Sequence, residues 1–184
     1  MQRLLIDGKK ILSGSITISG SKNATLPILA ATILNKNTTI SNIPFVNDIF
    51  TMIELLKSIG LRYKLSKKKK SVEVINEKKN INTVAPYKLV KTMRAGILVL
   101  GPLLARYKKA KVSLPGGCAI GSRPVDLHLF ALKKLGAKIK IKNGYIFASA
   151  TNGLSGAKIK FPSISVGATE NAILASVAAK GITV

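Results

Sequence analysis

Residues 55–64 read LLKSIGLRYK, and residues 131–140 read ALKKLGAKIK. In both stretches an apolar helix pattern ends at a glycine and an alternating strand pattern follows. The two stretches lie 76 residues apart, and a repeat of this length indicates supersecondary units that share a core. We therefore predict an α/β fold built from repeated strand-helix-strand-helix-strand units. The alternative is the generic rhythm of α/β proteins, in which helix-Gly-strand junctions are common.

The same order of elements is expected on both sides of these junctions. In the first unit we predict helix, strand, helix, strand and strand at residues 24–34, 38–43, 49–59, 61–65 and 71–75. In the second unit we predict helix, strand, helix and two hairpin strands at residues 89–107, 111–114, 127–135, 137–142 and 145–149. Pro27 falls in the first turn of its helix, where proline is tolerated, Asp48 is placed as a helix cap, and Asn143-Gly144 is a strong hairpin turn.

The two ends of the chain depart from this order. Residues 3–18 alternate around Gly8 and Lys9, which predicts a pair of strands. A third unit begins near Ser165, and residues 182–184 predict its first strand, where the sequence stops. We therefore expect a chain that is cut off inside its third unit.

The composition is strongly basic but poor in arginine. The formal net charge is +23, and only 5 of the 30 basic residues are arginine. Two interpretations stay open: a general drift of composition toward lysine, and a positive field that attracts anionic ligands. A basic RNA-binding module is a rival function that predicts RNA affinity falling steeply with salt. Interleaved aromatic residues for base stacking are not expected, which counts against this rival.

The remaining composition points to the cytoplasm. A single cysteine excludes an intramolecular disulfide. Residues 1–10 carry charge and lack the apolar core of a signal peptide. No apolar run reaches the roughly 18–20 residues of a membrane span. We expect no membrane partner.

Three loops stand at the starts of apolar helices, at residues 20–23, 91–94 and 166–171. Helix N-termini offer unpaired N–H groups and a positive dipole end, which suit phosphate or carboxylate groups. Lys22 would add a point charge, and Arg94 would add a fork that holds two oxygens. The alternative for Lys22 is that it is an ordinary solvated lysine without a ligand. For Arg94 a purely structural role stays equally open.

The loop at residues 115–124 carries the most chemical information. Glycines at 116, 117 and 121 permit backbone shapes that other residues avoid and let N–H groups converge on an anion. Cys118 lies between them, with Arg123 close by. A lone cysteine is usually buried and inert, whereas nearby cations would lower the pKa of a loop thiol and make it an acid or nucleophile. Both readings of Cys118 stay open.

Other chemistry has less support in the sequence. His128 is the only histidine, and a local packing or capping role is the safer interpretation. No His/Cys cluster indicates a metal site. Neither the phosphate-binding Gly-x-x-x-x-Gly-Lys-Ser/Thr motif nor a Gly-x-Gly-x-x-Gly motif after a strand occurs.

Residues 114–128, LPGGCAIGSRPVDLH, closely resemble the catalytic loop of the bacterial UDP-N-acetylglucosamine 1-carboxyvinyltransferase family. Three further segments resemble the same family: SGSKNA at 19–24, PYKLVKTMRA at 86–95 and SVGATEN at 165–171. Their order and spacing match as well, so the resemblance covers the whole chain. Four motifs in register are far more specific than any one of them.

The resemblance implies a fold and a reaction. Members have two inside-out α/β barrel domains, each built of three repeated units, with the active site in the cleft between them. Residues 1–20 would then belong to a second, mostly absent C-terminal domain, and residues 21–184 to the first domain, truncated in its third repeat. The implied enzyme transfers the enolpyruvyl group of phosphoenolpyruvate to the 3-hydroxyl of UDP-N-acetylglucosamine and releases phosphate, at the start of peptidoglycan synthesis. It needs no cofactor and no metal.

The resemblance also implies roles for individual residues. Cys118 matches the catalytic cysteine that fosfomycin alkylates, and Lys22, Asn23 and Arg123 match positions that bind phosphoenolpyruvate. Contacts to the UDP-sugar are implied for Arg94, Arg123, Pro124, Val125, Asp126, Leu127, Ser163, Ile164, Ser165 and Val166. Ser163 departs from the lysine often found there, which puts one phosphate contact in doubt.

Two more alternatives accompany this resemblance. The related 3-phosphoshikimate 1-carboxyvinyltransferase has the same architecture but lacks a cysteine loop of this kind. The chain could also be a degenerate fragment without function. Because the family's catalytic aspartate and several arginines have no counterpart in these 184 residues, we expect the chain alone to lack transferase activity.

Overall fold

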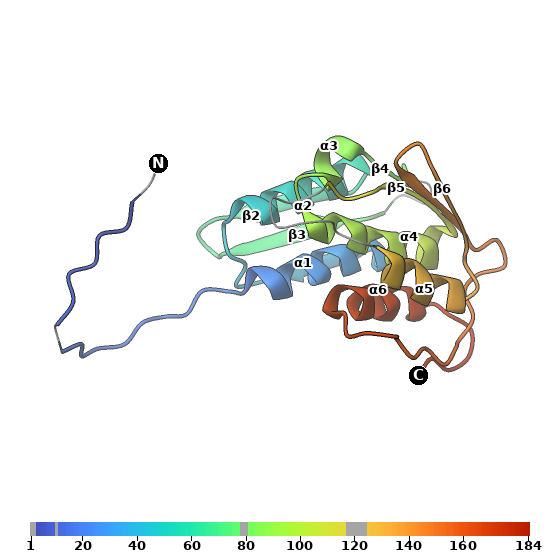
Figure 1. Ribbon diagram of the computed structural model, residues 1–184. Coiled ribbons are helices and arrows are strands. Elements are labelled where there is room, and N and C mark those ends of the chain that lie inside the picture. Colours follow the sequence, from blue (N-terminus) through green and yellow to red (C-terminus); the bar gives the residue numbers. More distant parts are fainter. Residues whose placement is uncertain (1–2, 10, 78–80, 117–124) are drawn as a thin grey trace.

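The computed structural model of the chain describes residues 3–9, 11–77, 81–116 and 125–184. Two α/β units follow one another, and a further helix lies beside them (Figure 1). The first unit consists of α1 (Lys22–Ala31), the 3-10 helix η1 (Thr32–Leu34), β1 (Asn37–Ile40), α2 (Asn47–Ser58), β2 (Arg62–Ser66) and β3 (Ser71–Ile75). Its three strands are antiparallel, in the order β1-β3-β2.

The second unit repeats this plan with one strand more. It contains β4 (Val84–Ala85), α3 (Tyr87–Val90), the 3-10 helix η2 (Arg94–Val99), α4 (Leu100–Tyr107), β5 (Lys109–Ser113), α5 (Asp126–Lys134), β6 (Lys138–Lys142) and β7 (Tyr145–Ser149). The strand order is β4-β5-β7-β6, and β4 and β5 run parallel. The predicted repeat and the predicted hairpin 137–142/145–149 are thus confirmed.

The ends of α2 and α5 show the repeat in atomic detail. After α2, the N–H groups of Ile59, Gly60 and Leu61 donate to carbonyls four, three and five residues back, and the corresponding three groups after α5 do the same. Gly60 has a φ of +106° and Gly136 a φ of +92°. Only glycine adopts this backbone without strain, so it closes the helix and turns the chain into the next strand.

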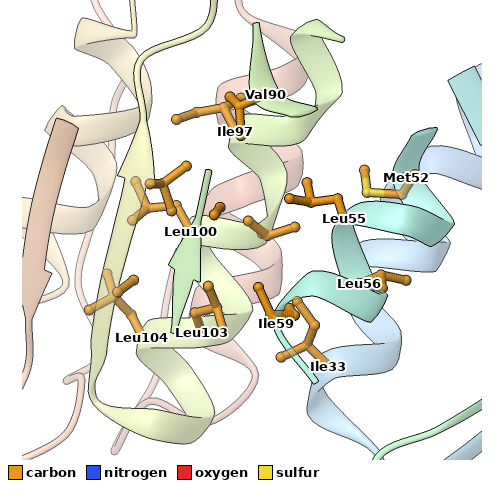
Figure 2. Close-up of a cluster of buried hydrophobic side chains, with 14 of the residues drawn as sticks. Ile33, Met52, Leu55, Leu56, Ile59, Val90, Ile97, Leu100, Leu103 and Leu104 are labelled. Carbon is orange, nitrogen blue, oxygen red and sulfur yellow. The ribbon is translucent and has the colours of Figure 1, made fainter. Parts of the chain in front are cut away.

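The core lies between the helices of the two units (Figure 2). Met52 and Leu55 on α2, with Ile59 directly after it, face Leu100 and Leu103 on α4 across this core. All five side chains are fully buried. Burying one such side chain contributes about 2 kcal/mol relative to leaving it exposed, so this contact fixes how the units dock.

One arginine serves this docking directly. Arg106, on α4, donates from Nη1 to the carbonyls of Ile33 (2.8 Å) and Asn35 (2.6 Å), and from Nη2 to that of Asn76 (3.2 Å). It thereby gives donors to the carbonyls of Asn35 and Asn76 and a second donor to that of Ile33, which also accepts from Asn76 Nδ2 (2.9 Å).

The third unit begins with α6 (Val166–Ser176), as the motif at residue 165 predicts, and α6 packs against α4 and α5. Residues 182–184 do not form the predicted strand. A parallel bridge joins Ser155 to Lys180, and Val184 exchanges backbone hydrogen bonds with Ala157 and Ile159. The pairing stays irregular because a residue is inserted between the bridge and these later bonds.

The prediction of one helix over residues 89–107 is wrong: the segment is divided into α3, η2 and α4. Two causes are visible. Pro102 has no N–H for a helical bond, and the N–H of Gly101 donates to the side chain of Asn171 instead (2.8 Å). The α-helix therefore begins only at Leu100.

The predicted strands at residues 3–18 are also absent among the described residues 3–9 and 11–20. Leu5 and Ile11 are essentially fully exposed, at 97% and 101%, and the segment extends away from the rest of the chain (Figure 1). Without a surface on which to bury its apolar side, an isolated strand pair is marginal.

Two helix starts differ from prediction by a few residues. The second helix starts at Asn47 with Val46 as its N-cap, so Asp48 lies in the first turn and is not the cap. The first helix starts at Lys22, which moves Pro27 into the second turn. No described helix is long and apolar enough to span a bilayer.

Candidate functional site

A cavity of about 530 Å³ opens where the first turns of α1, η2 and α6 meet. These are the three helix starts that the sequence singled out. The cavity is lined by Lys22, Asn23, Leu26, Pro27, Asp48, Met93, Arg94, Ala95, Ile97, Leu98, His128, Ile164, Ser165, Val166, Gly167 and Glu170.

The starts of α1 and α6 are built alike. Ser21 Oγ accepts the N–H of Ala24 (3.3 Å), and Ser165 Oγ accepts the N–H of Ala168 (3.3 Å). In each case the threonine that follows donates its hydroxyl back to the serine carbonyl. Both helices therefore point the positive end of their dipole at the cavity, with further N–H groups still free of helical partners.

Lys22 and Arg94 bring formal positive charge to the same cavity. Lys22 Nζ lies 2.8 Å from Asp48 Oδ2, with both side chains about half exposed. An exposed pair of this kind contributes at most about 1 kcal/mol, so an anionic ligand can compete for the lysine. Arg94 begins η2 and is exposed.

Pro27 changes the chemistry of the α1 start. Because proline has no N–H, the carbonyl of Asn23, four residues earlier, receives no helical hydrogen bond. Asn23 and Pro27 both line the cavity. The carbonyl of Asn23 therefore lacks a helical donor, while the free N–H groups of the first turn point the opposite way along the helix.

His128 and Asn171 form a buried polar cluster at the wall of the cavity, with 5% and 0% of their surfaces exposed. Asn171 Nδ2 lies 3.2 Å from His128 Nδ1 and donates to the carbonyl of Ile97, and Asn171 Oδ1 accepts the N–H of Gly101. Burial lowers the pKa of His128 to about 4, helped by the charge of Arg94 and opposed by Asp126. The ring is therefore neutral at pH 7.

Glu170 adds an acidic group to the α6 side of the cavity. Burial raises the pKa of its carboxyl above the ordinary value. The described lining of the cavity thus contains two acidic residues, Asp48 and Glu170, and two cations, Lys22 and Arg94.

The structure brings together six of the predicted site residues: Lys22, Asn23, Arg94, Ile164, Ser165 and Val166. Val125 is buried in the core instead, while Asp126, Leu127 and Ser163 do not line the cavity. Cys118, Arg123 and Pro124 lie outside the described residues.

Sequence reasoning placed Asp48 only as a helix cap and His128 only in a packing or capping role, and it gave Glu170 and Asn171 no individual role although both stand in the predicted helix start at residues 166–171. A signal for Asn171 was present, because the residues three and four positions away on its helix face, Ala168, Leu174 and Ala175 among them, are apolar. Glu170 stands in the quoted segment 165–171 but was given no role.

A second cavity, of about 490 Å³, lies on the sheet of the second unit. It is lined by Lys109, Lys111, Lys138 and Lys140 together with Phe147. Contrary to the sequence expectation, aromatic rings do stand among these lysines. The ammonium of Lys111 lies over the rings of Tyr145 (4.7 Å) and Phe147 (5.1 Å), however, so it occupies the ring faces that base stacking would need.

The sequence that forms this fold and cavity matches a known family. Residues 6–184 match the family model of EPSP synthase (3-phosphoshikimate 1-carboxyvinyltransferase), and the chain belongs to this family. Within it, the chain is 61% identical over all its 184 residues to a UDP-N-acetylglucosamine 1-carboxyvinyltransferase of Pelagibacter ubique. It is 52% and 54% identical to proteins of the same name from Nitratiruptor and Rickettsia prowazekii. The chain spans only 43% of the length of the Pelagibacter relative.

Solved structures of enolpyruvyl transferases share the fold. The transferase NikO from Streptomyces tendae matches with a TM-score of 0.77 at 19% identity, over 94% of this chain and 40% of its own. EPSP synthase from Acinetobacter baumannii matches with a TM-score of 0.64 at 15% identity, over 91% and 39%. The predicted fold class is thereby confirmed.

Proposed function

We propose that the chain forms the first part of an enzyme that transfers the enolpyruvyl group of phosphoenolpyruvate to the 3-hydroxyl of UDP-N-acetylglucosamine and releases phosphate. The observation that carries this proposal is identity of 52–61% over the whole chain to proteins named for that activity. The likeness to EPSP synthase structures, at 15% identity, bears on the fold alone. The 3-phosphoshikimate alternative therefore has the weaker support.

The cavity suits two phosphorylated substrates. Lys22 and Asn23 would hold phosphoenolpyruvate, since the lysine and the free N–H groups of α1 converge there. Arg94 and residues 164–166 would hold the UDP-sugar beside the start of α6, and the resemblance adds Ser163 and Arg123–Leu127 to that subsite. Positive groups fixed before the reaction stabilise negative charge without reorganising during it.

The chemistry assigned to Cys118 follows from the order of bond changes. The sugar 3-hydroxyl adds to C2 of phosphoenolpyruvate while C3 gains a proton, and loss of phosphate and a C3 proton then restores the double bond. Cys118 would supply the proton to C3 or assist product release, and its thiol would be the target of fosfomycin. Cytoplasmic location and a role in peptidoglycan synthesis follow from the same proposal.

The exposed N-terminal segment has a place in this proposal. Residues 3–9 and 11–18 carry seven large apolar side chains that are at least 77% exposed: Leu4, Leu5, Ile6, Ile11, Leu12, Ile16 and Ile18. We assign residues 1–20 to a second domain and residues 21–184 to the first. Such a domain would bury these side chains and supply the catalytic aspartate, so we expect the chain alone to be inactive.

A chimera tests the proposed activity. Residues 1–184 would be joined to the remaining part of the Pelagibacter relative, and phosphate release would be measured with each acceptor. We expect release that needs both phosphoenolpyruvate and UDP-N-acetylglucosamine, and none from the isolated chain. Release with shikimate 3-phosphate in place of the UDP-sugar, or turnover by the isolated chain, would contradict the proposal.

Two arginines provide a matched control within this assay. Arg94→Ala removes a cation from the cavity and should lower kcat/KM at least tenfold, as expected for loss of a charged hydrogen bond of about 1.5–3 kcal/mol. Arg62→Ala removes another exposed cation, which pairs with Glu77 and does not line the cavity, and it should leave turnover unchanged.

A further inference from the structure

The buried amide of Asn171 links its own helix, α6, to η2, α4 and α5. From α6 it meets the backbone N–H of Gly101 at 2.8 Å, the carbonyl of Ile97 at 3.3 Å and the ring of His128 at 3.2 Å. A Cβ atom at Gly101 would collide with Asn171 Oδ1. The sequence thus leaves room for this amide at the point where η2 passes into α4.

The two backbone partners fix which way the amide points. The N–H of Gly101 can only donate, so it requires the amide oxygen, and the carbonyl of Ile97 can only accept, so it requires the amide nitrogen. The second hydrogen of Nδ2 is then directed at His128 Nδ1. Because this nitrogen must accept, the ring proton of the neutral imidazole resides on Nε2.

The edge of the ring that carries this proton faces the start of α6. A Cβ atom at Gly167 would lie 3.4 Å from His128 Cε1 and 3.6 Å from Nε2, and His128 and Gly167 both line the cavity. We propose that Asn171 is a positioning residue that holds His128 as a neutral Nε2–H donor for an acceptor oxygen of the UDP-sugar. This inference rests on the proposed function.

The surrounding charges support a ring that stays neutral. Arg94 on η2 opposes protonation, and Asp126 on α5 favours it. Lys22 on α1 and Glu170 on α6 also face the cavity. If Nδ1 carried a proton, its N–H group would face the Nδ2–H group of Asn171. Two donors would then point at each other, and one buried donor would stay unpaired. A neutral donor binds an oxygen without adding a mobile charge between Arg94 and the ligand.

The first test uses the chain itself, in which His128 is the only histidine. Nitrogen-15 NMR should show a protonated Nε2 and an unprotonated Nδ1 at pH 7. Asn171→Asp keeps the shape but replaces the donor by an acceptor, so the proton should move to Nδ1. Asn152→Asp makes the same chemical change at an exposed turn and should leave the ring unchanged. An Nδ1–H ring in the unaltered chain overturns the proposal.

The second test uses the phosphate-releasing chimera and separates the two substrates. His128→Ala and Asn171→Asp should each raise KM for UDP-N-acetylglucosamine on the order of tenfold, with KM for phosphoenolpyruvate unchanged. His128→Gln carries an amide donor near the place of Nε2 and should recover most of the loss. It also keeps the test informative if Asn171→Asp fails to fold.

The outcomes distinguish this inference from the function on which it rests. If the chimera turns over but His128→Ala leaves both KM values unchanged, the inference fails and the proposed function stands. If the unaltered chimera shows no turnover, the proposed function fails, while the ring tautomer still decides whether Asn171 holds His128 as described.

Discussion

The first helix of unit one and its counterpart in unit two begin at the same cavity but differ in form. In unit one, α1 runs without a break from Lys22 to Ala31. In unit two, the corresponding segment changes from α3 to η2 to α4, and the break is where Asn171 takes the N–H of Gly101. The repeated parts build a scaffold, whereas the segment that departs from the repeat carries Arg94 into the cavity and is held by Asn171 from α6.

The largest expected effect is on the stability of the scaffold. Equivalent core substitutions in the two units should have equal effects there. Leu56 and Leu132 are equivalent in the repeat and are 2% and 0% exposed. Leu56→Ala and Leu132→Ala should each lower the free energy of unfolding by about 3 kcal/mol, because each leaves a cavity in a packed core. Urea unfolding monitored by circular dichroism measures this change.

The neighbours of these leucines are their controls. Lys57→Ala and Lys133→Ala alter exposed side chains in the same turns and should shift stability by less than about 0.5 kcal/mol. A large loss for one leucine with a negligible loss for the other would mean that the two units do not share a core.

Lowering the pH should reduce the free energy of unfolding through His128, which lies beside the segment that departs from the repeat. The pKa of His128 is lowered from 6.5 to about 4 in the fold, so between these values the unfolded chain binds the proton and the folded chain does not. The stability is therefore complete above pH 6.5 and falls toward pH 4, by up to about 3 kcal/mol. Glu170, whose pKa is raised, opposes part of this loss at the acidic end.

Unfolding free energies at pH 7, 6, 5 and 4 measure this loss. His128→Gln does not titrate and should have a flatter pH profile than the unaltered chain over the same range. Parallel profiles for the two proteins would show that His128 is protonated equally in the folded and unfolded states.

Local pattern predicted the scaffold well because its causes are local. The predicted strands at residues 71–75 and 145–149 match β3 and β7 residue for residue, since alternation and a turn signal define each one. The break at Arg94–Val99 was only partly predictable in this way: Pro102 is a local signal, but Asn171, which takes the N–H of Gly101, lies 70 residues from it in the chain.

The cavity shows the same division between local and distant causes. Ser21 and Ser165 could be recognised as helix starts from their own neighbours, and both start at the cavity. That their helices converge with η2 depends on tertiary packing, which no segment reveals alone. The prediction of strands at residues 3–18 was wrong although the local signal was present. Alternation predicts strands, but it does not supply the surface on which strands form.

The smallest expected effect concerns the two matching helix starts. Ser21→Ala and Ser165→Ala each remove one side-chain acceptor from a helix N-terminus, at Ala24 and Ala168 respectively. Each should lower the free energy of unfolding by about 1 kcal/mol. Ser21→Asp and Ser165→Asp retain an acceptor and should restore that stability, and urea unfolding of the four variants measures both changes. Equal losses of stability would show that the two serine N-caps stabilise their helices to the same extent. A loss confined to Ser165→Ala would show that α1 is stabilised by its packing and not by its cap.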